Sequence, residues 1–255
     1  MHDNYSHLED LDLTRLPSAP QVLIHLIDLF HQPEVSFEEL NQIIQQDSAL
    51  CARVISIANS AAYSQWKEVR DLKRILVVLG SKTIKSIALT TAVHQFFSQF
   101  SPQLGETLGS FWLDALICAH LSRSLAELTG YQNPDEAHVA GLLHQLGQLV
   151  FLSNEPEQYL ALLASTDDQS ELLLKEQQRY GINSADLAAD IITHWGLSSL
   201  LNDAVRFQHK TPGLLLDAKP LLKLINLSSQ MCNRINRSRN KPPIEDRFFA
   251  LNQSV

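Results

Sequence analysis

Hydrophobic residues along this chain recur at intervals of three and four, the spacing that places them on one face of an α-helix. In the first such segment, which follows the stretch LPSAP, the shared face is formed by Val22, Leu23, Leu26, Ile27 and Phe30. No segment shows the period-two alternation of a half-buried strand, and the chain has no internal repeat. The pattern therefore predicts an all-α fold.

Capping residues predict where several helices begin and end. Ser18 precedes the first helix, and Ser36, with Glu39 three residues later, forms a capping box before the second. Asp47 is expected to cap the third helix, and Gly80 to close a short fourth one. Ser81 is then the expected cap of the next.

A polar break, SPQLG at residues 101–105, predicts the boundary between two helical subdomains. Beyond it the pattern predicts a long helix over 106–129, closed by Gly130. Pro134 begins the next helix, in which AHVAGLLHQLGQLVFL at 137–152 is expected to be one continuous apolar element. Further helices are predicted over 155–165, 168–179, 184–194, 197–208 and 218–237.

Composition and charge narrow the class of protein. The chain has 255 residues, enough for one large or two small domains, and a formal charge of −8. That charge argues against a general nucleic-acid binder. Local exceptions are the basic residues of RINRSRNK, which form either a solvated helix end or a patch for an acidic partner: Arg234, Arg237, Arg239 and Lys241.

Cysteines and hydropathy point to an intracellular compartment. Cys51, Cys118 and Cys232 are far apart and odd in number, which argues against a disulfide framework or a thiolate zinc site. The N-terminal stretch is polar and acidic, unlike a signal peptide. No uncharged apolar run reaches the roughly 18–20 residues that span a bilayer. We therefore expect a cytoplasmic protein without membrane contact.

The sequence contains none of four common short motifs of catalytic or nucleotide-binding sites. The chain has no G-x-G-x-x-G, no P-loop, no G-x-S-x-G and no H-E-x-x-H. No two of its ten histidines are spaced i, i+4, so any metal site must combine separate helices. The polar pair His144–Gln145, inside the apolar stretch 137–152, is the feature that a purely structural helix would not require.

Six separated stretches carry a resemblance to a known family. They are LPSAP, IIQQDSALCARVISIANSAAY, ILVVLGSKTIKSIAL, FWLDALICA, AGLLHQLGQLV and YGINSADLAADIITHWGLSSLLNDAVRFQH. In this order and at these spacings they resemble the HDOD domain, a bacterial signalling module related to HD-type metal-dependent phosphohydrolases.

The resemblance implies an N-terminal bundle of helices packed against an HD-like helical subdomain. It implies a polar tail over 1–15, an HDOD domain over 16–211 divided into 16–103 and 104–211, and a helix and tail over 212–255 that complete the HD-like half.

The resemblance also implies that the metal site of the HD hydrolases is degenerate here. Its positions are occupied by Asp114, His144, Gln145, Ser184, Gln208 and His209. Gln145 stands in place of the aspartate, and a neutral amide oxygen is a weaker ligand than a carboxylate. A buried structural His144 is the main interpretation; a single-metal site of Asp114, His144 and His209 is the alternative.

Four residues are candidates for contacts between the subdomains. Trp112 and Trp195 are either core aromatics of the HD-like half or part of a binding groove. Asn59 and Ser60 either end a helix, with Asn59 tolerating left-handed backbone, or contact a partner.

Together these observations predict a non-catalytic HDOD signal-transduction protein without metal or cofactor. It would bind signalling proteins in trans, and a small nucleotide-type ligand is a further candidate. Nucleic acid, held by the basic residues near 234–241, is a minor option. The alternative function is a divergent metal-dependent phosphohydrolase that acts on nucleotides or cyclic dinucleotides.

Overall fold

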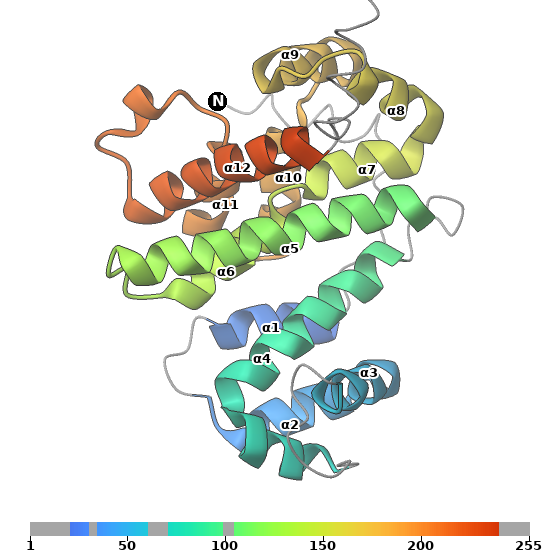
Figure 1. The fold of residues 1–255 in the computed structure, drawn as a ribbon, viewed down its shortest axis with the longest axis vertical. Coiled ribbons are helices and arrows are strands. Elements are labelled where there is room, and N and C mark those ends of the chain that lie inside the picture. The colour runs from blue at the N-terminus through green and yellow to red at the C-terminus, as the bar shows by residue number, and fades with distance from the viewer. Residues whose placement is uncertain (1–20, 31–34, 61–70, 99–104, 240–255) are drawn as a thin grey trace, which may run out of the picture.

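The structure is a computed structural model that describes residues 21–30, 35–60, 71–98 and 105–239. Every element in these ranges is helical, which confirms the all-α prediction. Figure 1 shows two groups of helices that meet along one seam. The N-terminal group contains α1 (Gln21–Phe30), α2 (Phe37–Gln45), α3 (Ser48–Ala58) and α4 (Leu72–Ser98).

The second group begins with α5, which lies along the seam beside α6 (Figure 1). Its elements are α5 (Gly105–Leu128), α6 (Pro134–Leu143), α7 (Leu146–Asn154), α8 (Pro156–Ala164), α9 (Gln169–Tyr180), α10 (Ser184–His194), α11 (Ser199–Arg206), the 3-10 turn η4 (Pro212–Leu215) and α12 (Pro220–Arg239). Helix α12 packs along α5 and against α11, so the C-terminal helix is part of this group.

Local capping follows the sequence closely. The Ser36 hydroxyl accepts the Glu39 N–H at 3.1 Å, and the Asp47 carboxylate accepts the N–H groups of Ala49 and Leu50, each at 2.9 Å. These caps satisfy N–H groups that have no partner inside their own helix. The predicted cap Ser18 and most of the predicted boundary at 101–105 lie outside the described residues.

Glycine sets the course of the chain at two helix ends. Gly80, with φ 79° and ψ 158°, divides α4 into two helical segments, and Gly130, with φ 69°, follows α5. Both positions were predicted, because only glycine adopts such backbone without strain.

By length and composition, α4 is apolar enough over Leu72–Phe96 to cross a membrane, but half of that window is buried inside the fold. The helix also carries Lys82 and Lys85. A core helix of a helical protein meets the same criterion, and we interpret α4 in that way.

Helices α5 and α6 of the second group are in close contact. Gly141 of α6 lies so near α5 that a Cβ atom there would be 2.7 Å from the Ala119 Cα and 2.7 Å from the Ser122 hydroxyl oxygen. Such distances cannot accommodate a side chain. The glycine therefore allows α6 to pack directly on the backbone of α5.

A partly buried ion cluster joins the two groups across the seam. The Asp135 carboxylate of α6 pairs with Arg123 of α5 at 2.7 Å and with the Lys85 ammonium of α4 at 3.5 Å. Lys85 also donates to the backbone carbonyl of Leu29 in α1 at 3.1 Å, and Arg123 donates to the Ser86 hydroxyl at 3.0 Å. Burial lowers the pKa of Lys85, and Asp135 opposes that shift. The cluster therefore ties α1, α4, α5 and α6 together.

We expect Asp135→Asn to lower the free energy of unfolding by about 2 kcal/mol, because it leaves two cations near the seam without their counter-charge. Urea denaturation measures this change. The matched control is Glu38→Gln, which breaks the exposed Glu38–Lys73 pair at 3.3 Å and should leave stability nearly unchanged. Equal effects of the two substitutions would contradict a structural role for the cluster.

Candidate functional site

The continuous helix predicted over 137–152 is wrong. The structure ends α6 at Leu143 and begins α7 at Leu146, so that the chain breaks at His144 and Gln145. The His144 ring Nδ1 lies 2.7 Å from the Gly141 carbonyl oxygen, to which it donates. This bond leaves Nε2 of the neutral ring as an acceptor.

A distant side chain stabilises the break. The Gln208 side-chain amide, which is fully buried, donates to the His144 carbonyl at 2.7 Å. The Asn226 side chain of α12 in turn donates to the backbone carbonyls of Gln208 at 2.9 Å and Lys210 at 2.8 Å. The His144 carbonyl, which the break frees, therefore accepts a hydrogen bond from Gln208. Helices α11 and α12 help to hold that donor in place.

Ser184 begins α10 and is held by a buried network that sequence reasoning missed. Its N–H donates to the Glu176 carboxylate at 2.7 Å, and the other oxygen of Glu176 accepts the Tyr159 hydroxyl at 2.7 Å. Burial raises the pKa of Glu176, while these donors lower it. On the opposite side, a Cβ atom at Gly147 would lie 2.0 Å from the Ser184 carbonyl oxygen. Helix α7 thus touches the start of α10 directly.

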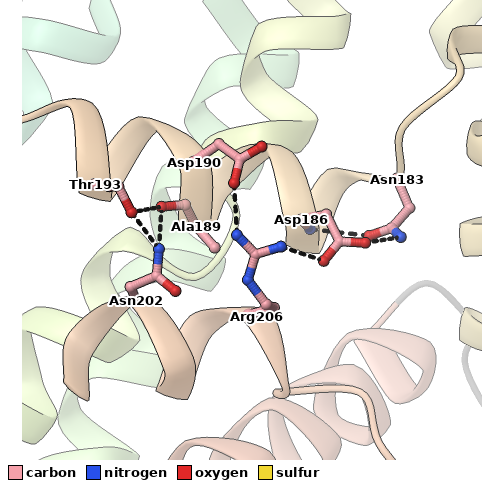
Figure 2. Close-up of polar contacts among 7 residues, drawn as sticks. All are labelled: Asn183, Asp186, Ala189, Asp190, Thr193, Asn202 and Arg206. Carbon is pink, nitrogen blue, oxygen red and sulfur yellow. Dashed lines mark hydrogen bonds and ion pairs between the residues drawn. The ribbon is translucent and has the colours of Figure 1, made fainter. Parts of the chain in front are cut away.

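Helix α11 is fixed to α10 by the polar network in Figure 2. Arg206 donates to Asp186 at 2.8 Å and to Asp190 at 2.5 Å, so that one guanidinium bridges two carboxylates one turn apart. The Asn202 amide donates to the Ala189 carbonyl and the Thr193 hydroxyl, each at 2.5 Å. This network positions the end of α11, and with it Gln208 and His209.

These elements enclose a small polar cavity of about 20 Å³. Its lining is composed of imidazoles, side-chain amides and one hydroxyl: His144, Gln145, Gln148, Gln169, Ser184, His209 and Asn233. The volume accommodates one water molecule. Four of the six predicted site positions meet here, and Gln208 supports the wall through its bond to His144.

Asp114, the sixth position, is not among the residues that line this cavity. Its backbone carbonyl accepts the Cys232 thiol of α12 at 3.4 Å, which places this turn of α5 against α12. The donor set that the single-metal alternative requires, Asp114 with His144 and His209, therefore does not surround the cavity.

Both cavity histidines are neutral at physiological pH. Burial lowers the pKa of His144 to about 4, although the hydrogen bond to Gly141 opposes that shift. Burial, together with the proximity of His144, lowers the pKa of His209 to about 3. The His209 ring nitrogens lie 3.4 Å from the Gln169 amide and 3.5 Å from the Ser229 hydroxyl.

The lining does not fit the divalent metal centre of an HD hydrolase. All donors at the cavity are neutral, and among the described residues no three His, Cys, Asp or Glu side chains gather as a metal would require. The side-chain oxygens of Gln145 and Gln208 are buried and accept no hydrogen bond from the described residues. Acceptors of this kind suit a water molecule better than they suit a dication.

The two predicted tryptophans lie at the seam. Trp112 of α5 makes an edge contact with His94 of α4, with ring centroids 5.0 Å apart, and Arg53 of α3 lies 3.3 Å from the same imidazole. Trp195, which follows α10, makes an edge contact with Phe96 of α4 at 5.3 Å. Aromatic contacts of both tryptophans therefore cross from the second group to α4.

Asn59 and Ser60 end α3 within the N-terminal group. Asn59 is the C-cap residue, with φ −90° and ψ 0°, and its amide donates to the Ile55 carbonyl at 2.9 Å. Asn59 thus ends the helix, as the first of the two interpretations held, with right-handed rather than left-handed backbone. The Ser60 N–H bonds to the Ile57 carbonyl at 3.0 Å.

Part of the predicted basic patch lies at the end of α12. Arg234 has an exposed side chain there. Arg237 and Arg239 belong to the last turns of the helix, but their side chains fall outside the described part, as does all of Lys241.

Comparison with known proteins gives both a family and a fold. The sequence profile of the HDOD domain matches residues 16–211. An uncharacterised protein of Treponema pallidum is 24% identical over 215 residues, which are 82% of this chain and 40% of the relative. The chain thus spans well under half the length of that curated relative.

Solved structures resemble this one over most of its length. An HDOD domain protein of unknown function from Geobacter sulfurreducens has a TM-score of 0.70 at 23% identity, over 85% of this chain and 72% of that one. A protein of Shewanella amazonensis, provisionally named a phosphohydrolase, has a TM-score of 0.71 at 24% identity, over 98% and 87%. A protein of Marinobacter aquaeolei, provisionally named a signal transduction protein, has a TM-score of 0.67 at 24% identity, over 86% and 50%.

We expect Gln208→Leu to lower the free energy of unfolding by about 2 kcal/mol, because the buried His144 carbonyl loses its donor. Thermal or urea denaturation tests this. Gln178→Leu, at an exposed position of α9, is the matched control and should have little effect. A neutral Gln208→Leu would show that the break at His144 does not depend on this bond.

Acidification should destabilise the fold between pH 6.5 and 4. The pKa of His144 falls from 6.5 to about 4 on folding, so the unfolded chain binds protons first as the pH falls, and stability declines with it. Relative to wild type, His144→Gln should reduce the slope of unfolding free energy against pH by about 1 kcal/mol per pH unit. Gln178→Leu, at an exposed position without a titratable group, offers the control and should keep the wild-type slope. Identical slopes in all three proteins would contradict a buried neutral His144.

Proposed function

The chain belongs to the HDOD domain family, and we propose that it is a non-catalytic signal-transduction protein of this family. It acts by binding partners rather than by turning over a substrate. One observation carries the proposal: the cavity at the HD-site positions is lined by neutral side chains only.

The chemistry of phosphodiester hydrolysis explains why this lining matters. Hydrolysis at a two-metal centre needs anionic ligands that hold two cations and a coordination position open to water and substrate. Gln145, where a carboxylate is expected, supplies an amide. A cavity of about 20 Å³ is also far smaller than the roughly 300 Å³ at which pockets for organic ligands begin.

The HD-site positions have structural tasks instead. His144 and Gln208 stabilise the break between α6 and α7, and Ser184 anchors the start of α10 on Glu176. Each of these groups is buried and hydrogen-bonded within the fold, as structural polar residues usually are. These bonds support the proposal that the HD-site positions hold the helices together rather than carry out a reaction.

We expect partners to bind at the seam. A partner bound there would change how the two groups of helices pack against each other. Clefts between packed units are common binding sites, and Trp112, His94 and Arg53 offer aromatic and cationic contacts there. The partners are signalling proteins supplied in trans, a role in line with the provisional name of the Marinobacter relative.

The provisional name of the Shewanella relative suggests the alternative, a metal-dependent phosphohydrolase. Metal analysis separates the two functions. Protein loaded with Mn²⁺ or Fe²⁺ and then desalted should retain far less than one metal ion per chain, and should not hydrolyse bis(p-nitrophenyl) phosphate. The paired substitution Gln145→Asp with Ser184→His, which supplies a carboxylate and an imidazole, should increase metal retention. One tightly held ion per wild-type chain that is lost in His144→Gln, with turnover, would overturn the proposal.

A further inference from the structure

The ion cluster at the seam brings two cationic side chains to one carboxylate. Lys85 and Arg123 both pair with Asp135. Lys82 lies near both Lys85 and Ser86 on α4, because it precedes them by three and by four residues. Three cationic side chains, those of Lys82, Lys85 and Arg123, thus gather near Asp135 in a chain whose formal charge is −8.

One donor in the cluster has no acceptor. Arg123 gives one terminal nitrogen to Ser86 and the other to Asp135. Its Nε is buried and forms no hydrogen bond with the described residues. An unpaired donor on a cationic group is costly unless water or an anion reaches it.

Two histidines lie beside Arg123 at the same seam. His120 of α5 makes an edge contact with His138 of α6, with ring centroids 5.4 Å apart. Burial and, second to it, the charge of Arg123 lower the pKa of His120 and bring the pKa of His138 to about 3. Both imidazoles therefore lie close to the Arg123 guanidinium.

The cluster can be reached from solvent. The side chains of Arg123 and Asp135 are 21% and 26% exposed, and those of Lys82 and His120 are exposed. An anion can thus approach the exposed part of the Arg123 side chain, while the Nε itself stays closed to solvent.

We propose that this cluster is a binding site for a phosphate-type dianion, which contacts Arg123, Lys82 and His120 beside Asp135. The guanidinium fork matches tetrahedral oxyanions, and Lys82 adds a mobile point charge. The phosphate is either free or part of a nucleotide. Lys82, Lys85 and Ser86 belong to α4, whereas Arg123 belongs to α5, so the bound anion would change how firmly the two groups of helices are held together.

This inference names a ligand class for the regulatory role proposed above. It concerns other residues than the HD-site cavity, and its test measures binding rather than turnover. Each proposal can therefore fail while the other stands.

Isothermal titration of the full chain with pyrophosphate is the test, at low ionic strength and neutral pH. We expect one saturable site with a dissociation constant below roughly 1 mM, weakened by added NaCl. Lys82→Gln should weaken binding roughly two- to fivefold, and Arg123→Gln roughly tenfold or more. The control Lys219→Gln, at an exposed position before α12, should bind as the wild type does.

Asp135→Asn gives the decisive result, since the internal carboxylate repels the incoming anion. It should strengthen pyrophosphate binding roughly tenfold, which a purely structural ion pair does not predict. If this variant does not fold, Lys82→Gln alone decides. Absence of saturable binding, or wild-type affinity in Lys82→Gln, would overturn the proposal.

The source of the phosphate is resolved by a parallel titration with nucleoside triphosphates and orthophosphate. Tighter binding of one nucleotide than of pyrophosphate supports a nucleotide ligand whose base makes further contacts. Equal affinities support recognition of the phosphate group alone.

Discussion

The Asp135 carboxylate is the interaction on which the arrangement of the two helix groups depends. It lies between an ammonium from α4 and a guanidinium from α5, and the same ammonium reaches the backbone of α1. Apolar packing alone permits helices to slide, whereas hydrogen-bonded charges specify one relative position. Because the cluster is partly exposed, solutes can reach it and alter the relative position of the two helix groups that it specifies.

The HD-site positions contribute to the packing of this fold. Four of the six line one cavity, and the chain breaks between α6 and α7 at His144 and Gln145. The donors there are imidazoles with lowered pKa values, amides and a hydroxyl, which surround a space for one water molecule. His144 and Gln208 donate to backbone carbonyls, so these side chains fix the course of the chain as well as the polarity of the cavity.

The sequence predicted the features whose physical cause lies within a few residues. It did not predict the features whose partners lie far away along the chain. The caps at Ser36 and Asp47 and the glycine at position 80 act within a few residues, so their patterns sufficed. The break at His144 was missed because its donor, Gln208, lies 64 residues away. The partners of Asp135 come from two other helices, and no spacing rule relates them. Resemblance supplied the site positions, but not whether Asp114 would line the cavity.

The contact between Gly147 and Ser184 has a consequence for the space between α7 and α10. Helix α7 approaches the start of α10 so closely that even a single methyl group at position 147 would collide with backbone. A larger ligand sphere would require the two helices to separate, and the Glu176 bond to Ser184 opposes that movement. The close approach of α7 to α10 thus keeps the space between them to about the size of one water molecule.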